Sequence, residues 1–99
     1  MKTVWQINMD FQKAMAAVER LNAIASGLES NADNLGTTID SIDRNWDGEN
    51  SEAYIVKGRK VQNNISLTAG GIRQVAATVE AIAIRTRDAE LAAISIAED

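Results

Sequence analysis

The six residues from Asn45 to Asn50 read Asn-Trp-Asp-Gly-Glu-Asn, and they separate two long segments with a helical pattern of apolar residues. Asn and Asp side chains favour turns and helix caps, and Gly48 can adopt the positive φ that other residues avoid. Two helices joined by so short a connection lie antiparallel. The segment therefore predicts an all-α fold, an antiparallel helix-turn-helix hairpin with its turn over residues 45–50.

Before the turn, apolar residues recur in unbroken alternating steps of four and three. This pattern predicts a first helix over about residues 10–45, with Asn8 or Asp10 as its cap. A weaker apolar line runs beside it through Met15, Ala17 and Ile24. The predicted inner line of this helix consists of Ile7, Phe11, Ala14, Val18, Leu21, Ala25, Leu28, Ala32, Leu35, Ile39, Ile42 and Trp46.

After the turn, the same spacing predicts a second helix over about residues 51–87, capped by Asn50 or Ser51. We expect Gly58 to make room for Trp46, which would cap the core at the turn. The tail, residues 88–99, is expected to continue the helix and then fray. The predicted inner line consists of Tyr54, Gly58, Val61, Ile65, Thr68, Ile72, Val75, Val79, Ile82, Thr86 and Ala89, and Ile55, Ala69, Ala76 and Ala83 widen the apolar face.

The two apolar lines on each helix exceed what one hairpin buries, so residues 1–99 are interpreted as a single hairpin domain with a partner surface. Two hairpins would form an elongated four-helix bundle, and a twofold homodimer is the commonest solution. Pairing with a different helical hairpin would bury the same surface. The residues expected to form the core and dimer seam are Leu21, Leu28, Leu35, Ile39, Ile65, Ile72 and Val79.

Composition and charge argue against several classes of function. The net charge of −4 argues against non-specific nucleic-acid binding, and no apolar run approaches the ~20 residues of a membrane span. The N-terminus lacks a secretory signal pattern. With neither Cys nor His, most nucleophile–base pairs and transition-metal sites are excluded. Asp40 and Asp43 lie one turn apart, but a solvated helix face explains them better than a catalytic pair. We expect no enzyme and no cofactor.

Charge is unevenly distributed along the chain. Residues 10–45 carry six acidic and three basic residues, whereas residues 51–87 carry two acidic and six basic ones. The hairpin would bring Asp40 close to the region of Lys57. The basic cluster of Lys57, Arg59 and Lys60 is therefore interpreted first as a pairing face between the helices, and second as a partner-binding patch.

A chain of 99 residues with Trp46-Asp47-Gly48 at its midpoint, a long amphipathic helix on each side, an aromatic Tyr54 six residues after the glycine and no Cys resembles the WXG100 family. These are the small ESAT-6-like substrates of type VII secretion. The resemblance implies a dimeric four-helix bundle that is made in the bacterial cytoplasm and secreted as a folded dimer without a cleaved signal peptide. It also implies a membrane complex driven by an FtsK/SpoIIIE-type ATPase.

The same resemblance implies a C-terminal export signal of the form Tyr-x-x-x-Asp/Glu after the second helix. The best alignment is residues 84–88, where Asp88 matches and Ile84 replaces the tyrosine. Either the signal is degenerate, or a partner carries the tyrosine. In the second case the chain is half of a heterodimer, or an accessory protein that pairs with the N-terminal helical domain of a larger type VII toxin. A generic helical adaptor with a chance Trp-x-Gly turn is the remaining alternative.

Overall fold

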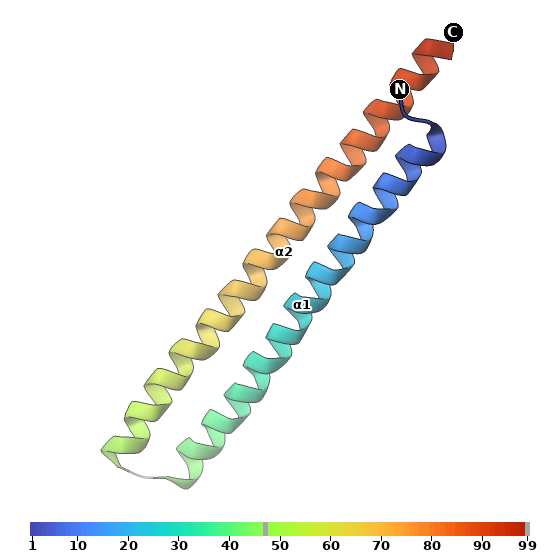
Figure 1. Ribbon diagram of the computed structural model, residues 1–99. Helices are drawn as coiled ribbons and strands as arrows, with labels where there is room; N and C mark the ends of the chain where they lie inside the picture. The colour runs from blue at the N-terminus through green and yellow to red at the C-terminus, as the bar shows by residue number, and fades with distance from the viewer. Residues whose placement is uncertain (47, 99) are drawn as a thin grey trace. The chain divides into compact units, whose positions relative to one another are not determined.

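The computed structural model describes residues 1–46 and 48–98, and for Asn50 only the backbone. It is an all-α helical hairpin, as the sequence predicts, with helices α1 (Val4–Asn45) and α2 (Glu49–Glu98) (Figure 1). Both helices extend beyond the predicted bounds. Helix α1 begins at Val4 rather than near residue 10. Helix α2 continues through residues 88–98, as expected for the tail, and remains helical to Glu98.

A capping box explains the early start of α1. The amide of Gln6 donates to the Thr3 hydroxyl at 3.1 Å, and the amide of Thr3 donates to the Gln6 side-chain oxygen at 2.8 Å. These two bonds satisfy amides that have no partner within the helix. The cap predicted at Asn8 or Asp10 is therefore wrong, since both residues lie inside α1.

At the other end of the hairpin, Gly48 directly precedes α2 and occupies the position of its N-terminal cap. Its φ of +119° is a conformation that side-chain-bearing residues rarely adopt. Its carbonyl accepts hydrogen bonds from the Glu52 amide at 3.2 Å and from the Ser51 hydroxyl at 2.8 Å. Ser51 is thus a buried residue of the first turn and not the cap. Asp47 and the side chain of Asn50 lie outside the described residues.

Contacts divide the hairpin into two compact units, and each contains a part of both helices. Unit 1 comprises Met1–Asn22 and Arg73–Asp99, and unit 2 comprises Ala23–Ile72. In unit 1 the antiparallel course follows from the contacts of Lys2 with Glu90 and of Asn22 with Arg73. In unit 2 it follows from the contact of Asp40 with Arg59.

The inner line predicted for α1 is confirmed except at its last position. Ile7, Val18, Ala25, Ala32 and Ile39 are buried, and the members between them are half-buried. Trp46 is exposed.

The inner line of α2 is only half as predicted. Every second predicted position faces inward, namely Gly58, Ile65, Ile72 and Val79. At the positions between them, the inward residue is the next one along the chain. Ala69 and Ala76 are therefore buried, while Val61 and Val75 are exposed. At positions 69, 76 and 83 the small alanine side chain permits close helix approach, whereas the larger Ile55 and Gln62 take the inward positions nearer the turn. The inward alternate positions are Ile55, Gln62, Ala69, Ala76 and Ala83, in place of Tyr54, Val61, Thr68, Val75 and Ile82.

Candidate interaction sites

The turn in unit 2 presents two exposed aromatic side chains. Trp46 is 61% exposed and Tyr54 is 67% exposed. The backbone of Trp46 is nevertheless fixed, because its amide donates to the Ile42 carbonyl at 2.9 Å and its carbonyl accepts from the Ser51 hydroxyl at 3.4 Å. The prediction that Trp46 caps the core is therefore wrong for this chain. These bonds hold the backbone of Trp46 directly after α1, and most of the residue's surface is exposed.

Gly58 serves Ile39 and not Trp46, which corrects a second expectation. A Cβ added at Gly58 would lie 2.8 Å from Cδ1 and 3.0 Å from Cγ1 of Ile39, whose side chain is only 3% exposed. The isoleucine thus fills the space that the missing glycine side chain leaves. Close packing of this kind fixes how the two helices meet in unit 2.

The basic cluster of α2 pairs across unit 2 through Arg59. Its guanidinium contacts the Asp40 carboxylate at 2.6 Å and donates to the Gln62 side chain at 3.3 Å. Arg59 lies two residues from Lys57, so the expected approach of Asp40 to the region of Lys57 is confirmed. Both side chains are about half exposed, so the pair is worth only ~0–1 kcal/mol.

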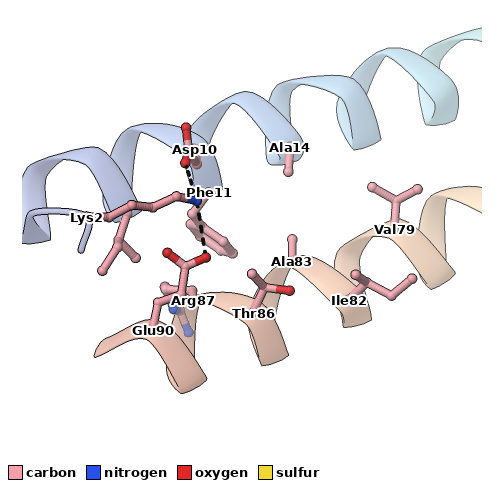
Figure 2. Close-up of a pocket in the computed structure, with 11 residues that line it drawn as sticks. Lys2, Asp10, Phe11, Ala14, Val79, Ile82, Ala83, Thr86, Arg87 and Glu90 are labelled. Carbon is pink, nitrogen blue, oxygen red and sulfur yellow. Dashed lines mark hydrogen bonds and ion pairs between the residues drawn. The ribbon is translucent and has the colours of Figure 1, made fainter. Parts of the chain in front are cut away.

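Unit 1 contains an apolar cleft of about 250 Å³ between its two helical segments. In Figure 2 the side chains of Ala14 and Ala83 point toward each other across it, with Val79 and Ile82 at one end. Two small residues facing each other leave space that larger side chains would have filled. The cleft is lined by Lys2, Ile7, Asp10, Phe11, Ala14, Val79, Ile82, Ala83, Thr86, Arg87 and Glu90.

Charged side chains form one rim of this cleft. The Lys2 ammonium lies 2.9 Å from the Asp10 carboxylate and 3.3 Å from that of Glu90, so it links α1 to α2 (Figure 2). Hydrogen bonds to Asp10 and then to Glu90 raise the pKa of Lys2, and the hydrogen bond from Lys2 lowers the pKa of Asp10. The Arg87 guanidinium lies 4.3 Å from the centre of the Phe11 ring, within cation–π range.

The residues aligned with the export signal lie within α2 in unit 1, not after the helix. Ile84 is about one-third exposed. The Asp88 carboxylate accepts a hydrogen bond from Arg87 Nε at 3.1 Å. All seven residues of the predicted core and dimer seam, by contrast, are buried or half-buried within the hairpin.

The hairpin leaves many large apolar side chains exposed. No large side chain is fully buried in the described residues, and four of the seven buried apolar residues are alanines. The chain exposes 7151 Å², whereas a compact monomer of 10.7 kDa exposes roughly 5,500 Å². The exposed large apolar residues are Met1, Val4, Trp5, Ile24, Trp46, Tyr54, Val56, Val61, Leu67, Val75, Ile82, Ile84 and Ile96.

Among the described residues, no group of three or more carboxylates lies close enough together to hold a metal ion. Neither helix, over the part of the chain described, is both long and apolar enough to cross a membrane.

Sequence reasoning missed the cleft and its rim. The capping pattern Thr3-x-x-Gln6 would have placed the start of α1 correctly. With that start, the antiparallel course of the helices brings Lys2 to the level of Glu90. The cleft itself had a weaker signal, namely small residues at facing inner positions such as Ala14 and Ala83.

No family model, curated protein or solved structure matches the chain.

Proposed function

We propose that this chain is a small, non-enzymatic helical protein of a type VII secretion system, exported as a folded dimer by an FtsK/SpoIIIE-type ATPase. The observation that carries the proposal is the exposed Trp46 indole held on the turn that Gly48 makes possible. Both residues belong to the Trp-x-Gly pattern on which the resemblance to WXG100 proteins rests.

The geometry separates the two roles of that pattern. Gly48 is needed by the backbone, because its φ of +119° would strain any other residue. Trp46 is not needed by the core, because most of its surface is exposed. Exposed aromatic residues on a rigid backbone are typical of recognition sites, where Trp is among the most frequent energetic anchors. This supports a role for Trp46 in binding rather than in folding.

The dimer is supported by surface area. The accessible surface exceeds that of a compact monomer by roughly 1,600 Å², and a standard interface buries about 800 Å² from each partner. One interface of ordinary size would therefore fit within the excess.

A second candidate function is an accessory protein that pairs with the helical domain of a larger type VII toxin. Two observations at the aligned export signal favour it: Ile84 stands where the family has tyrosine, and Asp88 is already bonded to Arg87. A signal that lacks its aromatic residue would have to be completed by the partner.

The first test compares two exposed tryptophans. In a bacterium with a working type VII system, we expect the wild-type protein in the medium only when the ATPase is active. Trp46→Ala should abolish export while leaving helicity and melting temperature unchanged. Trp5→Ala is the matched control, since Trp5 is also exposed but lies in the other unit. Export that is independent of the ATPase, or unaffected by Trp46→Ala, would contradict the proposal.

A second test separates the two candidates. If the chain is an accessory protein, it should be exported only when a toxin partner is co-expressed, and Ile84→Tyr should permit export alone. The control is Ala81→Tyr, which adds the same side chain at an exposed position nearby on α2. Export of the wild-type chain alone would exclude the accessory role.

A further inference from the structure

We propose that the open face of unit 1 is a docking surface for a second copy of this chain, which inserts an aliphatic side chain of its own α2 into the cleft between Ala14 and Ala83. The inference rests on the dimer of the proposed function and names the face that forms it. It is independent of whether the dimer is exported.

The cleft suits a side chain better than a small molecule. Its volume of about 250 Å³ lies below the ~300–1,000 Å³ typical of ligand pockets. Among the described residues, no buried side-chain polar atom lacks a hydrogen-bond partner. The floor is apolar, from Ala14, Val79 and Ala83. A cleft with an apolar floor, whose rim charges Lys2, Asp10 and Glu90 are paired with one another, resembles the hole that receives a knob in helix packing.

The two flanks of α2 in unit 1 differ, and only one is open. On one flank, Arg73 reaches Asn22 at 3.5 Å and Arg87 covers the Phe11 ring, so charged side chains close the hairpin. The other flank carries an uncharged residue every seven positions: Val75, Ile82, Ala89 and Ile96. Val75 is 54% exposed and Ile82 is 49% exposed, and Ile82 also forms a wall of the cleft. The spacing of seven is that of a helix–helix contact line.

The lack of charge on this line favours a second copy over a different partner. A twofold interface places the same patch on both sides, so any charge on the line would meet a like charge near the axis. Helical partners of different sequence are usually selected by complementary charges along the flanks of the contact. All four residues of the line are uncharged, so the line itself carries nothing that repels its own copy, and Arg85 lies beside the line rather than on it.

Filling the cleft tests this assignment. Ala83→Leu places an aliphatic side chain into the space reserved for the partner, whereas Ala81→Leu adds the same side chain on the exposed side of α2. Sedimentation equilibrium of the purified full chain should show a dimer for the wild type and for Ala81→Leu. Ala83→Leu should weaken the dimer about tenfold or more. Helicity by circular dichroism, which Ala83→Leu should retain, shows that the variant still folds.

A second pair of variants tests the line beside the cleft. Ile82→Glu places two like charges at the proposed interface and should yield a folded monomer, while Ala81→Glu should remain dimeric. A dimer that is equally tight in Ala83→Leu and Ile82→Glu would overturn the inference. A wild-type chain that stays monomeric at high micromolar concentration would also overturn the inference. The same holds for a chain that forms a dimer only with a different helical hairpin.

Measuring export in parallel keeps the two proposals distinguishable. If the wild type is exported and the cleft variants dimerise normally, the docking face is wrong and the secretion function stands. If the cleft variants lose the dimer but the wild type is never exported, the docking face stands and the secretion function is wrong.

Discussion

Unit 1 and unit 2 are parts of the same two helices, yet they fill the space between those helices differently. In unit 2 a large residue meets the smallest one, because Ile39 occupies the space left by Gly58. In unit 1 a small residue meets another small one, because Ala14 faces Ala83, and a cleft remains. Apolar spacing is equally regular in both units. What differs is the pairing of sizes across the interface, which determines whether a hairpin is closed on itself or open to a partner.

The largest effect that would test this contrast is expected at Ile39. Truncation by Ile39→Ala should lower the free energy of unfolding by ~2–5 kcal/mol, because the residue is buried and its space cannot be filled by a glycine opposite. Urea denaturation measures the loss. Ile24→Ala is the control, since Ile24 is about half exposed in the same unit. Equal losses in the two variants would mean that unit 2 is not closely packed.

A leucine added to each unit should have opposite effects. Gly58→Leu must displace Ile39, and overpacking of this kind costs ~1–3 kcal/mol, only partly offset by the better helix propensity of leucine. Ala83→Leu enters an existing cleft and should leave the stability of the monomer unchanged or increased. Melting curves at a concentration where both variants are monomeric give the comparison without the contribution of association. Destabilisation by both substitutions would contradict the proposed difference between the units.

The smallest effect concerns the Lys2 bridge of unit 1. The lowered pKa of Asp10 means that the bridge contributes to stability above the unfolded pKa of 3.8 and is lost as pH falls through the still lower folded pKa. The raised pKa of Lys2 means that the contribution is present below 10.5 and is lost as pH rises through the higher folded pKa. Glu90 faces the same ammonium, and Lys13 acts weakly on Asp10.

The measurement compares wild type with Lys2→Met by amide hydrogen exchange over residues 4–10. Between these two pH limits the wild type should be slightly better protected, and the difference should vanish beyond either limit. The groups are exposed, so salt should reduce the difference. A difference that persisted in acid would show that Lys2 acts through packing of its aliphatic stem and not through charge.

Much of the fold could be predicted from particular residues. The steps of four and three from Ile7 to Ile42 identified the buried face of α1, and Gly48 identified the turn. The face of α2 was harder, because its pattern offers two adjacent apolar lines. Hydrophobicity alone favours Val75 over Ala76, whereas the structure buries Ala76 and exposes Val75. A scale of apolarity ranks the larger residue first, but a close approach of the two helices at this point selects the smaller one.

One candidate site could be located from the sequence, and another could not. The Trp46-x-Gly48 pair could be located from its position between two helical patterns, but its sequence suggested a buried indole. The Lys2 bridge joins residues 88 positions apart, so it becomes visible only when the helices are paired.

The sequence by itself determined that this chain is two long helices joined at Gly48, because helical period, capping residues and the need for a positive φ are local properties. The tertiary structure alone decided which line of α2 faces α1, that Trp46 is exposed, and that a cleft lies between Ala14 and Ala83. These features depend on the sizes of side chains that meet across the hairpin, and size matching is a property of pairs of residues distant in the chain.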